Sequence, residues 1–469
     1  MLKIFARAIG AAASLALVMG LGVAGSAMAA STVHQSATTP APSWTSNAVV
    51  YEVNVRDYSE AGTLNAVTDD LPRLQALGVN ILWLMPIYPV GQLNAKGSMG
   101  SPYAVRDYKG INPDMGNAAD LHALISAAHA DGMHVVLDWV ANHSAWDNAW
   151  ITEHKDWYTQ DSNGNVLPPN NDWTDVADLN YDNAGLRSAM IDAMKYWVTD
   201  FDVDGFRCDY AAGVPTDFWN DATAQLRAAK SSLWFLAEDQ GESDKLTAAF
   251  DSDYGWSFKD TLYKLGNGSE YAFDFVNEIS SLGYDYSRKG TFPMLFITNH
   301  DENSWTGSLT SLYGTGAKTM AVLSFTALGI PLIYNGQEVD SDRRLQFFEK
   351  DVVDWNFDST RSKTAVAFYT KLIKLKHKNS ALNAGLNRLS FKALEASSIW
   401  TTAYRRSNGT NKVYVVANLS AKSHTTTVKW GSDKAYYYRY SDGKRMKLPT
   451  SAKYSLKPWQ FEIFSTVRP

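Results

Sequence analysis

The sequence predicts an α/β chain: a (β/α)8 TIM barrel with a small inserted subdomain after strand 3 and a C-terminal antiparallel β-domain. Short apolar strands alternate with helical stretches between residues 48 and 338, which indicates parallel βα units. Eight such strands are enough to close a barrel. After residue 378 the pattern changes to short strands separated by turns, which is typical of an antiparallel domain.

The eight expected strands are apolar runs. The run VNILWLMPI is apolar almost throughout, as expected when helices cover both faces of a sheet. Because the carboxyl ends of parallel strands meet at one end of a barrel, polar residues that end these strands should lie together. The strands are expected at 48–57, 79–87, 133–143, 203–209, 233–239, 248–254, 294–303 and 330–338, of which 248–254 is the weakest.

Helices are expected between these strands. Leu71, Leu74 and Leu77 share one helical face, and Gly78 marks the end of that helix. An asparagine with an aspartate three residues later, at the start of the next helix, has the spacing of an N-terminal cap. The helices are expected at 71–78, 117–131, 184–200, 216–230 and 361–378.

Two regions stand apart from the alternation. Residues 144–183 follow the third strand and are rich in Trp, Asn, Asp and Pro, which predicts a small inserted subdomain. We place the barrel domain at 45–385, including that insertion, and a C-terminal β-sandwich domain at 386–469. The short strands of the second domain are expected at 399–406, 412–420, 425–430, 435–440 and 460–465.

The N-terminus resembles an export signal. Two basic residues precede an apolar run at 8–25, and AMA at 27–29 is a small-residue cleavage site. An N-terminal membrane anchor is the alternative, but no stop-transfer flank follows. We therefore expect a signal peptide at 1–29, a flexible leader at 30–44, and a secreted or periplasmic protein with no membrane span in the mature chain.

Composition narrows the class of partner. The chain has one cysteine, Cys208, so it forms no intrachain disulfide, and we expect a small buried thiol. A formal net charge of −6 over 469 residues, with no basic run, argues against nucleic acid as a partner. The 16 Trp, 24 Tyr and 19 Phe supply a large core, and aromatic faces also serve exported proteins that hold sugars.

The stretch DVDGFRCDY carries an unusual pair. In a strand, Arg207 and Asp209 share one face, and Phe206 and Cys208 share the other. Arginine is charged at any ordinary pH, so we expect it to hold a buried Asp209 as an anion. An aspartate held in this way suggests a nucleophile or a metal ligand, with a structural ion pair as the plainer alternative.

Polar residues gather at the ends of four expected strands. Charged groups are seldom fully buried without partners, so this ring indicates a site more than core packing. A metal site is one reading, but the histidines match no compact zinc motif and an arginine beside the aspartate disfavours a cation. Glycoside hydrolysis, which needs two carboxyl groups, is the other. The residues are Asp138, Asn142, His143, Arg207, Asp209, Glu238, His300 and Asp301.

Several stretches, in chain order, resemble the conserved motifs of the α-amylase family, glycoside hydrolase family 13. The resemblance runs from about residue 48 to 340, and the C-terminal β-domain also fits the family. The matching stretches are GSPYAVRDYKGINPDMG (100–116), DWVANH (138–143), VADLN (176–180), GFRCD (205–209), FLAED (235–239), ITNHDEN (297–303) and GIPLIYNGQE (329–338).

The resemblance implies a role for each matching residue. Asp209 would be the nucleophile, Glu238 the general acid and then the base, and Asp301 the group that stabilises the transition state. Glu238 must then carry a proton near neutral pH. His143 and His300 would bind hydroxyls of the sugar at the cleavage point.

Three further residues would support these groups. Tyr103 would stack on the same sugar. Arg207 would keep Asp209 ionised and oriented from the same strand face, and Asp138 would be a buried orienting partner of Arg207.

The family often binds a structural calcium ion where the insertion meets the barrel, and Asn142 and Asp178 occupy the corresponding positions. Oxygen ligands suit calcium, but two residues are not a complete site, so calcium stays open and no cofactor is expected for the chemistry. Many α-amylases carry Lys and His where this chain has Ala212 and Gly213. That departure removes a contact on the leaving-group side and weakens the calcium case.

These features predict a retaining glycoside hydrolase that cleaves α-glucosidic bonds, α-1,4 in the first place, in starch-derived glucans or malto-oligosaccharides through a covalent glycosyl-enzyme. A transglycosylase or isomerase of the same family (trehalose-forming, branching or cyclodextrin-acting) stays open. A non-catalytic glucan-binding protein would have lost the carboxylates that this chain keeps. Ala212 and Gly213 cannot make the leaving-group contact of those Lys and His residues, which predicts a preference for short malto-oligosaccharides or cyclodextrins. Trp146, Trp157 or Trp173 could replace that contact.

Overall fold

The computed structural model of the chain describes residues 41–240, 244–286 and 290–469. The expected signal peptide and most of the expected leader lie outside these residues. In the described ranges, no helix is both long enough and apolar enough to cross a membrane.

Eight parallel strands close into a barrel within the described part of the chain, as predicted. The order around the barrel is β1-β2-β3-β6-β7-β8-β9-β10 and back to β1, and Asp138 of β3 pairs with Arg207 of β6. The strands are β1 (Val50–Val53), β2 (Ile81–Leu84), β3 (His134–Val140), β6 (Gly205–Asp209), β7 (Trp234–Ala237), β8 (Ser252–Tyr254), β9 (Phe292–Leu295) and β10 (Ile330–Tyr334).

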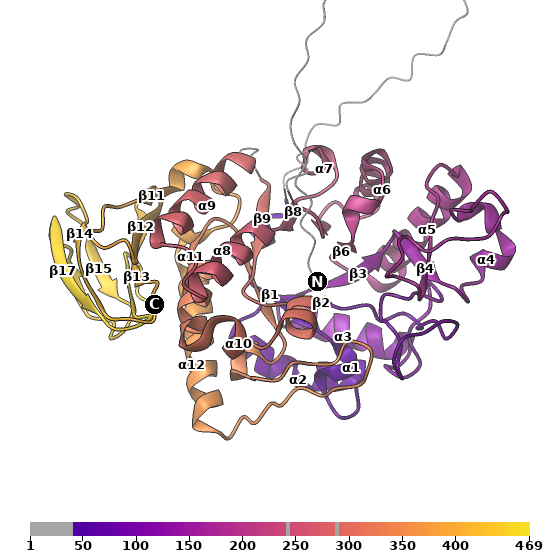
Figure 1. The fold of residues 1–469 in the computed structure, drawn as a ribbon, viewed down its shortest axis with the longest axis horizontal. Coiled ribbons are helices and arrows are strands. Elements are labelled where there is room, and N and C mark those ends of the chain that lie inside the picture. Colours follow the sequence, from indigo (N-terminus) through magenta and orange to yellow (C-terminus); the bar gives the residue numbers. More distant parts are fainter. Residues whose placement is uncertain (1–40, 241–243, 287–289) are drawn as a thin grey trace, which may run out of the picture. The chain divides into compact units, whose positions relative to one another are not determined.

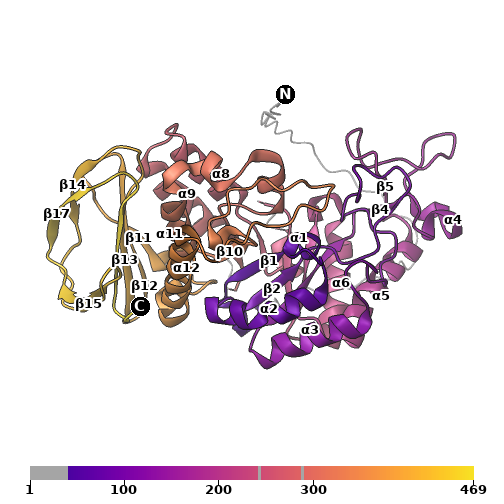
Figure 2. The ribbon, with the colours of Figure 1, turned by 90° about the horizontal axis from the view of Figure 1, so that it is seen from below.

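Helices surround the barrel (Figures 1 and 2). The cap of Asn117 and Asp120 and the helix end at Gly78 are both confirmed. The second helix begins at Leu64, earlier than predicted, because the Thr63 hydroxyl caps its first turn. The helices are α1 (Val55–Tyr58), α2 (Leu64–Leu77), α3 (Ala118–Ala130), α5 (Ala184–Phe201), α6 (Thr216–Ala229), α7 (Lys245–Ala248), α8 (Trp256–Gly266), α9 (Ala272–Asp285), α10 (Leu309–Tyr313), α11 (Ala317–Thr326) and α12 (Thr360–Lys378).

The stretch 294–303, predicted as one strand, is extended only as far as Leu295. Beyond it the chain turns into a π-helical segment, Glu302–Thr306. The Asn299 side chain accepts the Glu302 N–H at 2.8 Å, which favours this helical turn over a longer strand. Single π-helical turns are frequent at functional sites because they re-aim neighbouring side chains.

The insertion after β3 holds the antiparallel pair β4 (His143–Ala145) and β5 (Val176–Asp178), together with α4 (Trp150–Glu153). The C-terminal strands form an antiparallel six-stranded sheet, β11-β12-β13-β18-β15-β16, and a two-stranded sheet, β14-β17, around a shared apolar core. These strands are β11 (Phe391–Ala393), β12 (Thr401–Asn408), β13 (Asn411–Asn418), β14 (His424–Lys429), β15 (Tyr436–Arg439), β16 (Arg445–Lys447), β17 (Ser451–Leu456) and β18 (Phe461–Ser465).

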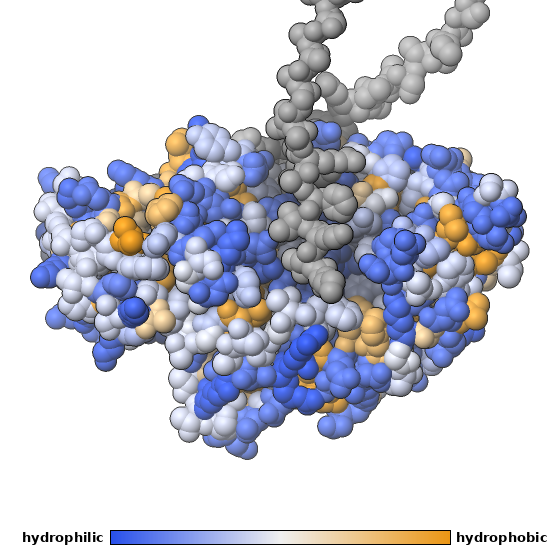
Figure 3. All heavy atoms as spheres, in the orientation of Figure 1, coloured by the Kyte–Doolittle hydropathy of each residue, from blue (hydrophilic) through white to orange (hydrophobic). Residues whose placement is uncertain are grey.

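The C-terminal strands lie beside α9, α11 and α12 in both ribbon views (Figures 1 and 2). Arg406 of β12 is fully buried and donates to the carbonyls of Thr326 and Ala327, where α11 ends. Lys376 of α12 donates to the Gly329 carbonyl at 2.9 Å. A cation at a helix C-terminus is favourable, and the Arg406 bonds join β12 to the end of α11. The face in Figure 3 is mostly hydrophilic, with hydrophobic residues in small, separate patches.

Candidate active site

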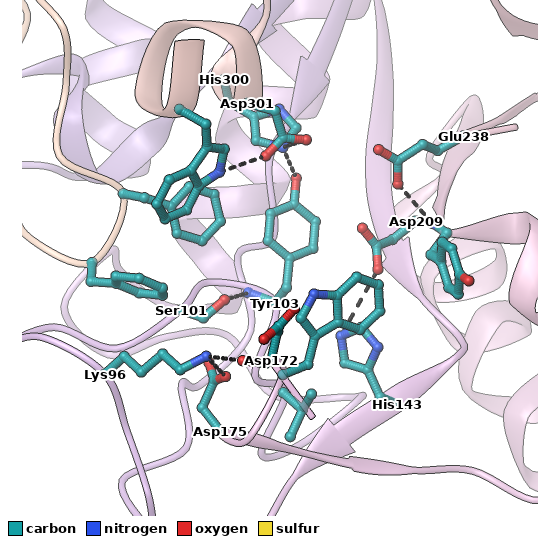
Figure 4. Close-up of a pocket in the computed structure, with 16 residues that line it drawn as sticks. Lys96, Ser101, Tyr103, His143, Asp172, Asp175, Asp209, Glu238, His300 and Asp301 are labelled. Atoms are coloured by element: carbon teal, nitrogen blue, oxygen red, sulfur yellow. Dashed lines mark hydrogen bonds and ion pairs between the residues drawn. The ribbon is translucent and has the colours of Figure 1, made fainter. Parts of the chain in front are cut away.

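A pocket of about 400 Å³ lies at the carboxyl ends of the barrel strands. It brings together all three predicted catalytic carboxylates and the predicted sugar-binding residues Tyr103, His143 and His300 (Figure 4). Its lining residues are Lys96, Ser101, Tyr103, His143, Asp172, Trp173, Asp175, Val176, Asp209, Tyr210, Glu238, His300, Asp301, Trp305, Phe347 and Phe348.

Arg207 lies fully buried next to this pocket and anchors its carboxylates. Its Nη1 donates to Asp138 Oδ1 at 2.8 Å and to Asp209 Oδ1 at 3.0 Å. Its Nη2 lies 3.0 Å from Glu238 Oε2, an ion pair outside hydrogen-bond geometry, and its Nε donates to the Tyr254 hydroxyl at 2.9 Å. One guanidinium thus contacts three carboxylates that reach it from β3, from β6 and from the end of β7.

Negative charge exceeds positive charge around Arg207. Burial raises the pKa of Asp209, and the charge of Glu238 raises it further, against the opposing effect of Arg207. Arg207 lowers the pKa of Asp209, in the predicted direction, but burial and the charges of Glu238 and Asp138 outweigh this effect.

His300 connects two carboxylates across the base of the pocket. Its Nδ1 lies 2.5 Å from Glu52 Oε1, and its Nε2 lies 3.3 Å from Asp301 Oδ2 and 2.9 Å from the Tyr103 hydroxyl. Burial lowers the pKa of His300, but Asp301 and Glu52 outweigh burial and raise it to about 9. The Tyr103 ring stacks on the His300 ring at 5.4 Å, and its hydroxyl donates to Asp138 Oδ2 at 3.0 Å.

His143 is the first residue of β4, and its Nε2 lies 3.9 Å from Asp209 Oδ2. Burial lowers the pKa of His143 to about 4, so the ring is neutral at pH 7. The Asn142 amide donates to His143 Nδ1 at 3.2 Å, which leaves the ring proton on Nε2. His143 therefore presents an N–H to the pocket.

The residue after Asp209 has a strained backbone. Tyr210 adopts φ 40°, in the left-handed region, and its N–H donates to Glu238 Oε2 at 2.8 Å. Its ring meets Trp173 of the insertion edge to face at 5.1 Å. A Cβ at Gly213 would lie 2.2 Å from Asn142 Oδ1 and 2.6 Å from the Tyr210 ring. Position 213 thus has no room for a side chain while Tyr210 keeps this place.

Sequence reasoning missed several pocket residues. Lys96, from the loop after β2, contacts Asp175 Oδ1 at 2.8 Å and donates to the Asp172 carbonyl at 2.7 Å, so it ties that loop to the insertion (Figure 4). Lys96 lies outside the family motifs, so the sequence did not indicate that it lines the pocket. Trp305 donates to Asp301 Oδ1 at 3.2 Å. The two residues are four positions apart, which in a helix places them side by side, so the sequence could have indicated this contact.

The aromatic residues of the insertion divide into two groups. Trp173 lines the pocket, so it is placed to replace the contact that Ala212 and Gly213 cannot make. Trp146 instead donates to the Thr174 carbonyl, and Trp157 packs against Trp150; neither lines the pocket.

The predicted calcium ligands lie close together in the backbone but do not form a cage. The Leu179 N–H donates to the Asn142 carbonyl, and the Asp178 carboxylate accepts the Thr159 hydroxyl at 2.6 Å. Over the residues that the structure describes, no group of three or more His, Cys, Asp or Glu could hold a metal ion. The donor set does not fit a complete calcium site on its side chains, and calcium binding stays open.

Comparisons with known proteins agree with this site. The family model described as the alpha amylase catalytic domain matches residues 52–362. Alpha-amylase MalA of Haloarcula japonica is 29% identical over 412 residues, which cover 84% of this chain and 58% of that protein. The chain spans 58–66% of the length of the first three curated relatives that it matches.

Two solved structures are similar over nearly their whole length. The noncanonic maltogenic alpha-amylase AmyB from Thermotoga neapolitana has a TM-score of 0.80 at 28% identity and covers 89% of this chain and 98% of its own. An alpha-amylase from Lactobacillus plantarum has a TM-score of 0.79 at 30% identity and covers 90% of this chain and 100% of its own. Since the family model matches more than half of the residues, and the barrel and pocket agree with it, the chain belongs to the alpha-amylase family of glycosidases.

Proposed function

We propose that the chain is a retaining glycoside hydrolase that cleaves α-1,4 bonds in malto-oligosaccharides. The arrangement of Asp209 and Glu238 carries the proposal: the two carboxylates contact two nitrogens of one guanidinium, each at 3.0 Å, and line one pocket. This shared anchor favours the close carboxyl spacing of retaining enzymes, about 5–5.5 Å, over the wider spacing of about 6.5–9.5 Å that admits a water molecule.

The first step forms a glycosyl ester. The Asp209 carboxylate attacks the anomeric carbon while Glu238 gives its proton to the glycosidic oxygen, and the bond between that carbon and that oxygen breaks. Glu238 then accepts a proton from water, which attacks the same carbon and releases Asp209. Two inversions leave the sugar with its original configuration. The Tyr210 N–H, at 2.8 Å from Glu238 Oε2, holds the proton donor in place between the steps.

Charge at the pocket wall supports the transition state. Asp301 presents a carboxylate to the pocket, where it would stabilise the positive charge that develops on the sugar ring. His143 is neutral and donates an N–H, so it would bind a sugar hydroxyl without opposing that charge.

The pocket favours short substrates. Lys96 and Asp175, which form an ion pair, line it on the side away from Glu238 (Figure 4). Tyr210 also lines it, and its N–H contacts Glu238 at 2.8 Å. A bounded pocket contacts few glucose units, so distant units add little binding energy to the transition state. Similarity to a protein named maltogenic alpha-amylase also supports short products.

Kinetics and product analysis test this proposal. We expect kcat/KM to rise less than about 10-fold from maltotriose to maltoheptaose, with maltose and glucose as main products from both and from cyclodextrins. Proton NMR of the first products should show the α-anomer. A steep rise with chain length and an early fall in starch viscosity would contradict the preference for short substrates. Products longer than the substrate would favour the transglycosylase alternative.

We also propose that the chain is exported. The support is the basic, apolar and small-residue pattern of residues 1–29. Protein recovered from the periplasm or medium of an expressing bacterium is expected to begin at Ala30. Protein that stays in the cytoplasm and begins at Met1 would contradict export.

A further inference from the structure

Glu52, on β1, is a fully buried carboxylate outside the set of residues that the motifs identify. Its Oε1 lies 2.5 Å from His300 Nδ1, and its Oε2 has no hydrogen-bond partner among the described residues. A buried carboxylate with a single partner is costly, so the contact with His300 must stabilise it.

The protons on His300 follow from its neighbours. Asp138 accepts hydrogen bonds from Trp83 Nε1 at 3.1 Å and from Arg207 Nη1 at 2.8 Å. Burial raises the pKa of Asp138, but Arg207 and His300 oppose this effect and favour the ionised acceptor. The Tyr103 hydroxyl, 3.0 Å from Asp138 Oδ2, therefore donates to that carboxylate and has no second proton for the histidine. At 2.9 Å, His300 Nε2 must then donate to the Tyr103 oxygen.

The other ring nitrogen is also a donor. Nδ1 faces the Glu52 carboxylate, which can only accept when ionised. A neutral histidine has one N–H and would leave either Glu52 or Tyr103 without its bond. Burial raises the pKa of Glu52, but the charge of His300 opposes this effect. With Glu52 ionised, both bonds are satisfied together only when the ring of His300 carries two protons.

We propose that Glu52 is a positioning residue that holds His300 as an imidazolium, with its Nε2 proton directed at Tyr103, Asp301 and a hydroxyl of the reacting glucose unit. The proposal rests on the proposed function only for the identity of that sugar. An imidazolium forms a charge-assisted hydrogen bond, which is about twice as strong as a neutral one.

The charges around the ring agree with this state. Asp301 and Glu52 lie within 3.3 Å and 2.5 Å of its two nitrogens and raise the pKa of His300 to about 9, against burial and Arg207. The ionisable groups that face the ring are Glu52 from β1, Tyr103 from the loop after β2, Asp138 from β3, Arg207 from β6 and the neighbouring Asp301. Two carboxylates beside one imidazolium also prevent it from adding net positive charge next to an oxocarbenium-like sugar.

The variant Glu52→Gln tests the proposal because it keeps the size of the side chain and removes its charge. Without the carboxylate, burial is opposed by Asp301 alone, so the pKa of His300 should fall toward the ordinary histidine value of about 6.5. The ratio of wild-type to variant kcat/KM on maltotriose should then rise to as much as about 30 at pH 8 and fall toward 1 near pH 5.5. A merely structural role for Glu52 would give a ratio that does not change with pH.

Glu338→Gln is the matched control. Glu338 is also fully buried, but its partners are Tyr51 and Arg73, and it does not line the pocket. Whatever Glu338→Gln does to stability, its activity relative to the wild type should not change with pH. The same pH trend in both variants would overturn the assignment to Glu52.

Nitrogen-15 NMR of histidine-labelled wild-type protein provides a readout that needs no activity. The His300 signal, identified by its loss in His300→Gln, should show two protonated nitrogens at pH 7. A singly protonated ring at pH 7 would overturn the proposal, and this spectrum decides the matter even if Glu52→Gln does not fold. A wild-type protein with no glycosidase activity would refute the proposed function and leave this result standing.

Discussion

Replacement of Asp209 by asparagine should stabilise the fold at neutral pH while it abolishes turnover. Asp209 is 8% exposed, and burial and Glu238 raise the pKa of its carboxyl group. A carboxyl group whose pKa is raised by folding contributes its full stability below the unfolded value of about 3.9. That contribution is lost as the pH rises through the folded pKa, so ionised Asp209 destabilises the fold at pH 7.

Two opposing effects set the size of the change. Asp138 Oδ1 and Asp209 Oδ1 contact the same Arg207 nitrogen at 2.8 Å and 3.0 Å, so these two oxygens lie within about 6 Å of each other. Repulsion between two like charges at that separation is about 3 kcal/mol at an effective dielectric constant of about 20. Asparagine also replaces the charge-assisted bond from Arg207, now 3.0 Å long, with a neutral one. That replacement lowers the free energy of unfolding by about 1 kcal/mol. We therefore expect Asp209→Asn to raise the free energy of unfolding by about 1–2 kcal/mol at pH 7.

The assay is denaturant unfolding of both proteins from pH 4 to pH 8 at constant ionic strength. The increase in the free energy of unfolding of Asp209→Asn over the wild type should be largest at pH 7–8, and it should vanish as wild-type Asp209 becomes protonated. Asp204→Asn is the matched control, because Asp204 directly precedes the same strand. Burial raises the pKa of Asp204, but the contact with His134 and the bonds from Lys230 and the Val135 N–H outweigh burial and hold it well below its usual range.

The two variants should therefore move in opposite directions. Asp204→Asn should destabilise at pH 7, and its effect should shrink as the pH falls through the unfolded pKa and toward the folded one. The reasoning would be refuted if Asp209→Asn were less stable than the wild type at pH 7, or if its stability difference were the same at pH 4 and pH 7.

Four other outcomes are expected. Glu238→Gln should lower kcat/KM on maltotriose by about 10²–10⁴-fold and remove the basic limb of the pH–rate profile, and an unchanged profile would place the acid elsewhere. Gly213→Ala should lower the free energy of unfolding by about 1–3 kcal/mol, because its Cβ would lie 2.2 Å from Asn142 Oδ1. The exposed Ala212→Ser should have no such effect in the same unfolding assay. Lys96→Ala should raise the ratio of kcat/KM on maltoheptaose to that on maltotriose, and an unchanged ratio would show that Lys96 does not limit substrate length. Dialysis against EDTA should leave Tm unchanged, and a fall in Tm that calcium reverses would show a metal site built on backbone oxygens.

The pattern of the sequence was enough for the barrel and for the candidate catalytic carboxylates. Strand and helix periodicity are local properties, so the eight strands and the cap at Asn117 could be read residue by residue. Strand alternation alone placed Arg207 and Asp209 on one face, where they meet at 3.0 Å. Family motifs then identified the residues that line the pocket beside Asp209, including Glu238 and Asp301.

Only the tertiary structure decided the proton distribution and the limits of the pocket. Glu52 and His300 are 248 positions apart in the chain, and no local pattern reports a contact at that separation. The pKa of Asp209 rises where the sequence predicted an anion, because burial and neighbouring carboxylates depend on what the fold brings together. For the same reason the room at Gly213, which Tyr210 and Asn142 fill, could be seen only once the loops were in place.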